Sequence, residues 1–399
     1  MHNCISITDT LTYLGGNDRR IALFESAYPV PRGVSYNSYL LKDEKTVLFD
    51  TVDEAVAEQF FENLSCALGE RALDYIVVHH MEPDHSATLR RLLRAHPEVT
   101  VVTTQKAAAM MKNYFGFAGK TALVKEGDTL CVGAHTLRFV LAPMVHWPEV
   151  MMTYVAEEGI LFSADAFGTF GALPGSIFAD EVDFERDFLA DARRYYFNIV
   201  GKYGVQVQNV LKKAAGLEIR LVCPLHGPVW RRDFAWYLEK YCTWSGYLPE
   251  ERGVAVFYAS VYGHTQNAAE IVASAVAAKG VKVRVYDVSV TSVGELVSEA
   301  FRFSHAVFAS TTYNNGIFIS MEQLLADLAA HAWQNRAYAV IENGSWAPQA
   351  GGLMDAQLSA MKNMRRIGEK TTVLSAVNDE SAAALRELAA LVAADVLDN

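Results

Sequence analysis

The sequence predicts a two-domain α/β protein, and three observations lead to this prediction. The chain has 399 residues, more than the roughly 250 to 300 residues at which a single hydrophobic core stops growing. Short β-rich runs alternate with helical stretches along its length. The segment 246–253, GYLPEERG, is polar and carries glycine and proline, and the pattern changes after it. We therefore expect domains at residues 1–248 and 253–399.

The composition indicates a folded protein whose main partner is not a polyanion. Hydrophobic residues make up 51% of the chain and charged residues 20%, which is ordinary for a globular protein. The 46 acidic residues outnumber the 35 basic ones, for a net charge of −11. Such a charge disfavours nucleic acid or an anionic membrane as a partner.

The sequence also predicts a cytoplasmic location. Residues 1–20 lack the basic start and apolar run of a secretory signal, and no apolar stretch is long enough to span a membrane. The cysteines are odd in number and widely spaced, without a C-x-x-C pair, which argues against a disulfide framework or a zinc ribbon. We expect most of them to be small core residues: Cys4, Cys66, Cys131, Cys223 and Cys242.

In the first domain, strand-like runs alternate with turns and occasional helices. This pattern indicates layered sheets with helices outside. The expected strands are residues 47–52, 75–80, 99–104, 137–143, 151–156 and 159–165.

In the second domain, five strands are each followed by a helix. The strands are expected at residues 254–259, 281–288, 305–310, 337–342 and 371–376, and the helices at 266–278, 293–300, 321–330, 354–361 and 380–393. This alternation predicts a doubly wound parallel sheet, which binds ligands where loops leave the carboxyl ends of the strands.

The strongest local signal is the run HMEPDH at residues 80–85, between a strand and a helix. In an extended segment, residues 80, 82 and 84 project to one side, and His85 adds a second imidazole as the chain turns. Imidazole and carboxylate groups are metal ligands. A solvated polar loop is the alternative, but such loops rarely contain two histidines.

Three further candidate ligands follow strand-like runs, namely His146, Asp165 and His226. Taken alone, each is more typical of a structural residue that satisfies backbone groups at a strand end. Their significance comes from the set that they complete with the run at residues 80–85.

The order H-x-E-x-D-H, H, D, H resembles the metallo-β-lactamase-like domain of the flavodiiron proteins over about the first 245 residues. The resemblance implies an αββα sandwich with two irons. His80, Glu82 and His146 would hold one iron, Asp84, His85 and His226 the other, and Asp165 would bridge them. Zinc hydrolases of the superfamily usually have histidine where this chain has Glu82. A carboxylate there favours iron over zinc.

Other polar residues near these runs receive weaker assignments. His79 faces away from His80, and we expect it to pack or to support the ligands. Cys223 is not expected to bind metal, because the seven ligands already satisfy two ions. Tyr195 and Tyr196 resemble a family segment near the metals; we name Tyr196 as a candidate proton or hydrogen-bond donor, with core packing as the alternative.

The first loop of the second domain is a candidate phosphate site. A phosphate there would meet backbone N–H groups at a helix N-terminus and the hydroxyls of Ser260 and Thr265, while Gly263 would allow close approach. The G-x-x-x-x-G-K pattern of nucleotide hydrolases is absent. The candidate contacts are Ser260, Val261, Tyr262, Gly263, His264 and Thr265.

Two more loops follow the third and fourth strands. They contribute Thr312, Tyr313, Asn314, Asn315 and Gly316, and Asn343, Gly344, Ser345 and Trp346. Together the three loops resemble flavodoxin over residues 253–399, which implies the strand order 2-1-3-4-5 with FMN at the switch point. Tyr313 and Trp346 would flank the flavin ring. His264 and Thr311 depart from the common Asn and Pro, and a doubly wound domain without cofactor is the alternative.

The two halves together resemble flavodiiron proteins of the simplest class. These oxidoreductases reduce dioxygen to water or nitric oxide to nitrous oxide, with electrons passed through FMN to a diiron site. No C-x-x-C module follows the flavodoxin part, so an external donor such as rubredoxin is implied. The alternatives are a zinc-dependent hydrolase with a flavodoxin regulatory domain and a non-enzymatic flavin electron carrier.

The resemblance further implies a head-to-tail homodimer, or a dimer of such dimers, in which each FMN serves the irons of the other subunit. The linker permits this arrangement. About eight residues span at most roughly 28 Å, whereas a domain of about 245 residues has a radius of gyration near 18 Å.

Overall fold

A computed structural model describes residues 3–116 and 119–398, which form two compact units at residues 3–241 and 242–398. The division falls within helix α8 (Phe234–Ser245), just before the polar segment at 246–253. Residues 1, 2 and 399, at the outer ends of the two expected domains, lie outside the described residues.

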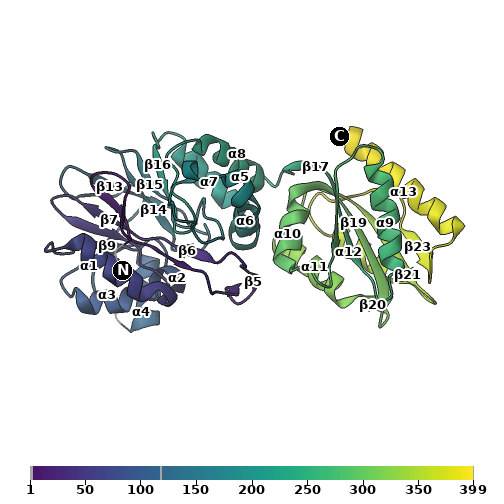
Figure 1. Cartoon of the computed structure of the whole chain (residues 1–399), viewed down its shortest axis with the longest axis horizontal. Coiled ribbons are helices and arrows are strands. Elements are labelled where there is room, and N and C mark those ends of the chain that lie inside the picture. Colours follow the sequence, from purple (N-terminus) through teal and green to yellow (C-terminus); the bar gives the residue numbers. More distant parts are fainter. Residues whose placement is uncertain (1–2, 117–118, 399) are drawn as a thin grey trace. The chain divides into compact units, whose positions relative to one another are not determined.

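The first unit is a sandwich of two sheets (Figure 1). One sheet has the order β1 (Ile5–Ser6), β2 (Leu11–Tyr13), β7 (Tyr39–Lys42), β8 (Thr46–Phe49), β9 (Tyr75–Val77), β10 (Thr100–Thr103), β11 (Lys120–Leu123). The other has the order β12 (Thr129–Cys131), β13 (Thr136–Leu141), β14 (Met151–Val155), β15 (Ile160–Phe162), β16 (Leu221–Cys223). Two small hairpin-like pairs flank them, β3 (Gly16–Asp18) with β6 (Val34–Tyr36) and β4 (Leu23–Phe24) with β5 (Tyr28–Pro29).

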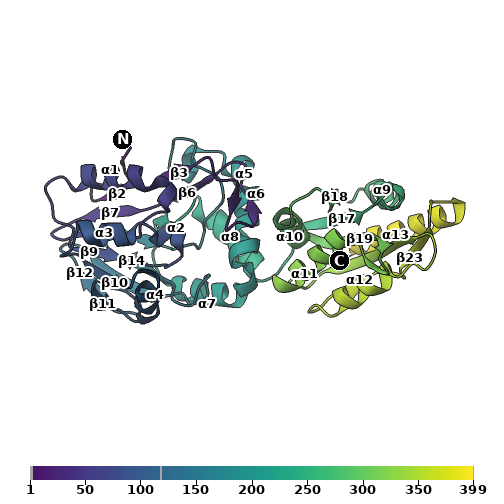
Figure 2. The same ribbon diagram turned by 90° about the horizontal axis from the view of Figure 1, so that it is seen from below.

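The core of this unit lies between the two sheets, because alternate residues of both contribute to one apolar cluster. Phe49 of β8 stacks on Phe162 of β15, with ring centroids 3.8 Å apart. Helices cover both outer faces, and Figure 2 shows α1 outside β2 and β7. They are α1 (Ala57–Leu68), α2 (Pro83–Ser86), α3 (Leu89–Ala95), α4 (Gln105–Phe115), α5 (Phe184–Asp187), α6 (Leu189–Tyr195), α7 (Gly204–Ala214) and α8. The αββα prediction is confirmed.

The second unit is a parallel sheet with the order β18 (Val283–Asp287), β17 (Glu251–Ala259), β19 (Phe303–Tyr313), β21 (Ala337–Gly344) and a fifth position. The predicted order 2-1-3-4-5 is confirmed. The fifth strand differs from the expected run at 371–376, because two short pieces pair with β21, β22 (Arg365–Arg366) and β23 (Thr371–Leu374). In addition, β19 continues into a hairpin with β20 (Gly316–Ile317).

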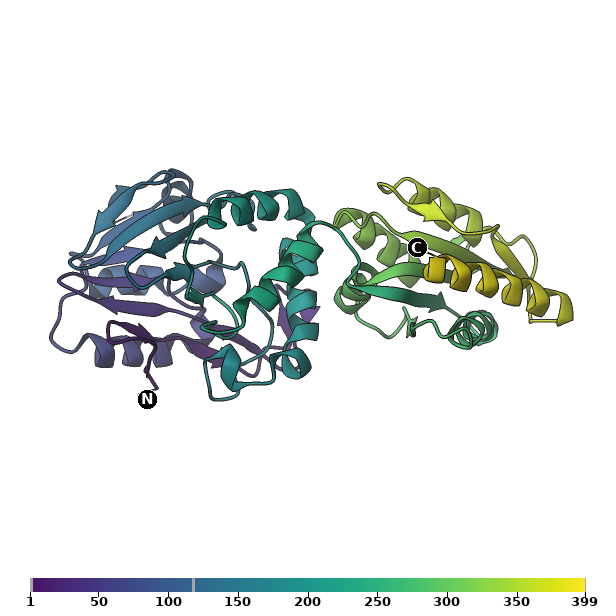
Figure 3. The same cartoon turned by 90° about the horizontal axis from the view of Figure 1, so that it is seen from above.

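Helices cover both faces of this sheet. Val254 and Val256 of β17 join the core formed with α9 (His264–Ala277) and α13 (Asp379–Asp398), the yellow helix in Figure 3. Phe257, the residue after Val256, stacks on Phe308 toward the opposite face. That face carries α10 (Val293–Arg302), α11 (Ile319–Ala330) and α12 (Ala350–Ser359). None of the helices in the described residues has the length and apolar character of a membrane span.

The expectation that most cysteines are core residues is wrong. Cys66, Cys131 and Cys242 are exposed and Cys4 is half-buried, whereas Cys223 is buried in β16. The exposed ones occupy the solvent sides of their elements, a choice of face that composition does not reveal.

Candidate metal centre and cofactor pocket

Seven buried side chains converge where loops leave the strands of the sandwich. His80 and Glu82 follow β9, and Asp84 and His85 lie in α2. The loops after β13, β15 and β16 supply the other three, His146, Asp165 and His226. The structure therefore brings together every ligand candidate of the sequence analysis. The expected extended run at 80–85 is corrected at its second half, since a helix begins at Pro83 and a helical turn carries Asp84 and His85.

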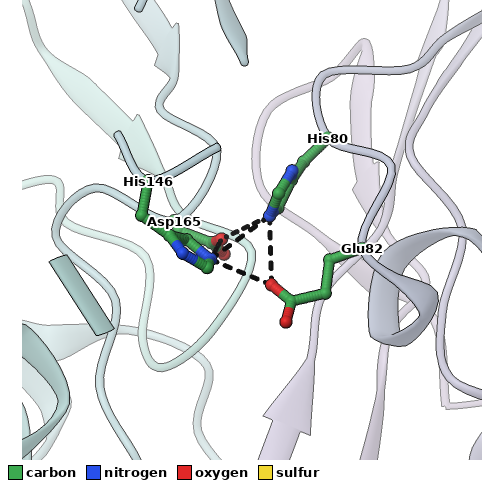
Figure 4. A group of neighbouring side chains, drawn as sticks. All are labelled: His80, Glu82, His146 and Asp165. Atoms are coloured by element: carbon green, nitrogen blue, oxygen red, sulfur yellow. Dashed lines mark hydrogen bonds and ion pairs between the residues drawn. The ribbon is translucent and has the colours of Figure 1, made fainter. Parts of the chain in front are cut away.

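The first group of donors is His80, Glu82, His146 and Asp165 (Figure 4). The Nε2 atom of His80 lies 3.1 Å from Glu82 Oε2 and 3.3 Å from His146 Nε2. Asp165 Oδ2 lies 3.2 Å from His80 Nε2 and 3.4 Å from His146 Nε2. All four donor atoms thus face one small volume.

The second group is Asp84, His85 and His226. The Nε2 atoms of His85 and His226 lie 3.1 Å apart. Asp84 Oδ2 lies 3.3 Å from His85 Nε2 and 3.1 Å from His226 Nε2. Asp165 Oδ1 faces this group, 3.2 Å from His85 Nε2. One carboxylate therefore directs one oxygen to each group.

The spacing and chemistry of these donors fit two divalent metal ions. Bonds of about 2.1 Å at tetrahedral or octahedral angles place neighbouring donors about 3.0 to 3.4 Å apart, as observed. The carboxylate oxygens of Asp84 and Asp165 are buried without a well-aligned hydrogen bond among the described residues, and buried polar groups without partners are rare. Imidazole combined with carboxylate suits non-haem iron.

Without metal the cluster is a network of opposite charges. Burial acts to lower the pKa of His80, but Asp165, Glu149 and Glu82 outweigh it and raise that pKa well above its usual value. Burial acts to raise the pKa of Asp165, but His85 and His80 hold it well below its usual value. Metal ions would replace the protons that these imidazoles bind.

Residues that are not candidate ligands themselves orient the ligand side chains by hydrogen bonds. The most important of them, Glu149, was not predicted from the sequence. Glu149 is buried, and its Oε1 accepts hydrogen bonds from His80 Nδ1 at 2.8 Å and Met81 N at 3.0 Å. This contact turns His80 Nε2 toward the donor group. His226 is fixed in the same way, since its Nδ1 donates to the Ser35 carbonyl at 2.8 Å. The only local signal for Glu149 is its place three residues after His146.

His79 has other partners, as expected. Its Nδ1 lies 2.5 Å from Asp50 Oδ2 and its Nε2 lies 2.7 Å from Thr153 Oγ1. Cys223 lies in the apolar core between the sheets, where burial raises the pKa of its thiol.

Aromatic rings enclose the cluster. Those of Phe24, Tyr36 and Tyr195 pack against His226 with centroids 5.6, 5.7 and 5.4 Å from it. The Tyr195 hydroxyl is buried, and burial, with Asp165, raises its pKa well above the usual value. Tyr196, the tyrosine named from the sequence, instead packs against Phe197 and Tyr241. A π-helical turn at Tyr196–Val200 begins with Tyr196 and directly follows Tyr195; such turns are often found at functional sites.

A further acidic residue reaches the cluster from the turn between β4 and β5. Glu25 occupies a left-handed backbone conformation with φ of 49°. Burial of its carboxyl group, followed by the neighbouring Glu82, raises the pKa of Glu25 to about 8. No motif in the sequence points to this residue.

The second unit has a cavity of about 580 Å³ at the carboxyl ends of β17, β19 and β21. Its size is typical of a cofactor site. Most of the predicted FMN contacts line this cavity. Thr311, Ala347 and Ser375 also line it, although they were not among the predicted contacts. The predicted contacts Gly263 and Gly316 are not among the lining residues. The lining consists of Ser260, Val261, Tyr262, His264, Thr265, Thr311, Thr312, Tyr313, Asn314, Asn315, Asn343, Gly344, Ser345, Trp346, Ala347 and Ser375.

The geometry at the start of α9 suits a phosphate. Gly263 caps the helix with φ of 87°, and its N–H donates to Ser260 Oγ at 3.0 Å. The first N–H groups of a helix have no intrahelical acceptors and attract anions. Tyr262 is 89% exposed and Trp346 82% exposed at the rim, so large apolar rings are available to cover a planar ligand.

Comparison with known proteins divides the chain in the same way. Residues 34–227 match the model of the ODP family of beta lactamases, and residues 256–388 match that of flavodoxin.

Individual relatives match nearly the whole chain. An anaerobic nitric oxide reductase flavorubredoxin from Vibrio vulnificus is 30% identical, over 94% of this chain and 81% of its own. Rubredoxin oxygen:oxidoreductase from Desulfovibrio gigas is 25% identical, with a TM-score of 0.94 over 99% of both chains. A flavo di-iron protein variant from Thermotoga maritima is also 25% identical, with a TM-score of 0.91 over 98% of both chains.

Proposed function

We propose a function for this chain from the premise that it belongs to the flavodiiron proteins, which join a metallo-β-lactamase-like domain to a flavodoxin domain. It is an oxidoreductase that reduces dioxygen, nitric oxide or both, with electrons passing through FMN to a diiron site. The observation that carries this conclusion is the pair of donor groups that share Asp165.

The cofactors supply the electron chemistry: when bound, FMN delivers electrons and the iron pair binds and activates the gas. The chain supplies the ligands. We assign His80, Glu82 and His146 to one iron and Asp84, His85 and His226 to the other, with Asp165 as the bridge. Three carboxylates among seven ligands make the site hard and anionic, which favours iron over zinc.

Neighbouring side chains perform three tasks around this site. Glu149 holds His80 in the orientation that presents Nε2. The rings of Phe24 and Tyr36 pack against His226 and exclude water from it. We assign the donor role to Tyr195 rather than Tyr196, because the Tyr195 ring contacts His226 and its high pKa keeps the hydroxyl proton in place for donation.

In the second unit we assign the FMN phosphate to the N-terminus of α9, with Ser260 and Thr265 as side-chain donors. Tyr313 and Trp346 would flank the flavin ring, and backbone groups near Asn314 and Gly344 would contact its polar edge. The support is the cavity that these loops line and the N–H groups of the first turn of α9, after Gly263, which have no intrahelical acceptors.

The electron donor is proposed to be a rubredoxin or a similar small carrier, since relatives carry rubredoxin in their names. We also propose a cytoplasmic location and a head-to-tail homodimer. The exposed aromatic rings of Tyr262 and Trp346 beside the cavity support the dimer, because exposed apolar patches mark interaction surfaces.

The test is metal analysis and an optical spectrum of the purified protein, followed by anaerobic turnover with a reduced donor and each gas. Two irons and one FMN per chain, with consumption of dioxygen or nitric oxide, are expected. Zinc in both positions would favour the hydrolase alternative, and metal and flavin without turnover of either gas would favour a simple electron carrier.

A further inference from the structure

Two cysteine side chains lie together on the surface of the first unit, outside the metal centre. Cys4 directly precedes β1, and Cys66 lies near the end of α1. The Cys4 thiol donates to the Asn63 carbonyl at 3.3 Å, and burial and then the neighbouring Cys66 contribute to a raised pKa of Cys4.

The helix geometry explains this proximity. Asn63 and Cys66 are three residues apart in α1 and therefore share a face. Side chains on a helix lean toward its N-terminus, so the Cys66 sulfur is directed toward the turn that contains Asn63. Cys4 is bonded to that same turn.

The segment that carries Cys4 is tied to the helix on its other side. Asn3 N donates to Asn63 Oδ1 at 3.2 Å, and Asn63 Nδ2 donates to Asn3 Oδ1 at 2.7 Å. After Cys4 the chain enters β1, where Ile5 pairs with Tyr13. The two thiols are thus held together by contacts on both sides of Cys4.

We propose that Cys4 and Cys66 are a redox-modification site, at which hydrogen peroxide converts the two thiols to a disulfide between the β1 segment and α1. The exposed Cys66 thiolate attacks peroxide, which forms a sulfenic acid and releases hydroxide. The Cys4 sulfur then displaces the sulfenic oxygen. In total two thiols lose two protons and two electrons, and one peroxide becomes two waters.

The different environments of the two thiols indicate which of them reacts with peroxide first. Cys66 is exposed and accessible to peroxide, whereas Cys4 is half-buried against the helix. Burial, followed by the neighbouring Cys66, raises the pKa of Cys4, so this group remains a thiol until its partner is oxidised. Cys131 offers a matched control, since it is exposed like Cys66 but lies in β12, where its thiol donates to the Gly133 carbonyl.

To test the proposal, the full chain is treated with a small excess of hydrogen peroxide and then quenched with an alkylating reagent under denaturing conditions. Mass spectrometry of the intact protein and of its digested peptides follows. Wild type and Cys131→Ser should lose two alkylatable thiols and about 2 Da, and yield a Cys4–Cys66 linked peptide that a dithiol reductant cleaves. Cys4→Ser should gain oxygen at Cys66 without a link. Cys66→Ser should leave Cys4 reduced.

A second measurement is thermal unfolding. Oxidation should raise the midpoint of wild type by a few degrees, because the link closes a loop of about 60 residues, and should not raise that of Cys4→Ser. The proposal is overturned if wild type gains only oxygen at Cys66, if both thiols stay reduced, or if the linked peptide joins another pair of cysteines.

Discussion

At the residue scale, the metal centre depends on Glu149 as well as on its ligands. This buried carboxylate accepts hydrogen bonds from both the ring and the following backbone N–H of His80. Replacing Glu149 by Ala should free the His80 ring to rotate and lower iron affinity about 10- to 100-fold. A chelator titration measures this loss.

Glu149→Gln is the matched control, because its amide oxygen still accepts both hydrogen bonds. It should retain most of the affinity, and FMN content should be unchanged in both variants. Equal iron affinity in wild type and Glu149→Ala would remove the assigned orienting role.

The same residues show how far the sequence predicts the site. The convergence of the seven candidate donors was predictable because four of them fall within six residues and the others each follow an apolar run. Glu149 and Glu25 were not, because packing of distant loops brings them to the cluster. Between Tyr195 and Tyr196 the sequence offered no basis for choice, since only the helix geometry determines which ring contacts His226.

At the element scale, the turns of the two sheets in the first unit are joined by His135. Its Nδ1 lies 2.7 Å from Asp43 Oδ2, after β7, and its Nε2 lies 2.7 Å from Glu158 Oε1, before β15. Burial acts to lower the pKa of His135, but both carboxylates outweigh it and raise that pKa. Burial likewise acts to raise the pKa of Asp43, but hydrogen bonds from the ring and backbone of His135, followed by those from the backbone of Ala134 and Glu44, lower it to about 2.

These shifts determine a pH window for the contribution of His135 to stability. Because the pKa of His135 is higher in the folded state, its ion pairs stabilise the fold fully at pH values below the unfolded-state pKa of about 6.5. This stabilisation is lost as the pH rises through the folded-state pKa. A lowered carboxyl pKa stabilises above its unfolded value of about 4 and loses the effect as pH falls toward the folded one. The midpoint difference between wild type and His135→Gln should therefore be largest near pH 5 to 6.

Thermal unfolding from about pH 3 to pH 9 measures this difference. His331→Gln is the comparison, because the Nδ1 of His331 bonds to the backbone carbonyl of Asp327 rather than to a carboxylate. Its effect on the pKa of the Asp327 carboxyl is outweighed by burial, so its midpoint difference should depend less on pH. A His135→Gln difference that is constant across the range would contradict the assignment.

The start of α9 allows a prediction about FMN with a matched pair of variants. Ser260→Asp and Ser260→Asn have nearly the same shape, and both retain an acceptor for the Gly263 N–H. Only the aspartate brings a negative charge to the assigned phosphate position, so it should bind FMN at least about tenfold more weakly than the asparagine. Flavin fluorescence during titration of the flavin-free protein measures both affinities. Equal FMN affinities of the two variants would show that the phosphate does not bind beside Ser260.

The elements themselves were mostly predictable, and the exceptions have physical causes. Regular alternation of strand and helix predicted that the second sheet is parallel, since parallel strands require crossovers, and the resemblance to flavodoxin implied the strand order that the sheet has. The division of its last strand into β22 and β23 was not visible, because a run as short as Arg365–Arg366 carries no periodic signal. The turn of α2 was missed because Pro83, which often marks a helix start, lies within a run of ligand residues.

At the scale of the whole molecule, each unit holds one part of the proposed reaction, and the proposed dimer determines how the parts cooperate. In a two-fold dimer, a contact between the flavin region of one subunit and the metal unit of the other occurs twice. The exposed rings of Tyr262 and Trp346 at the cofactor cavity are suited to such a contact. The decisive question is whether electrons cross between subunits.

A mixed dimer answers this question. Asp165→Ala removes the carboxylate shared by both donor groups, so it should lose iron and activity but keep FMN. Ser260→Asp should keep iron, and dialysis at a protein concentration below its raised dissociation constant for FMN should remove its FMN. Two different affinity tags allow the dimer with one subunit of each kind to be isolated, and its iron and flavin contents can be measured before turnover.

Such a dimer contains one intact flavin and one intact iron pair, in different subunits. If electrons cross between subunits, it should turn over gas at about half the wild-type rate, since one of the two routes remains. The two parent homodimers, each of which lacks one cofactor, should be inactive. If electrons instead stay within each chain, neither subunit has a complete route and the mixed dimer should be inactive too. An inactive mixed dimer with the expected iron and flavin would therefore exclude the head-to-tail arrangement as the working unit.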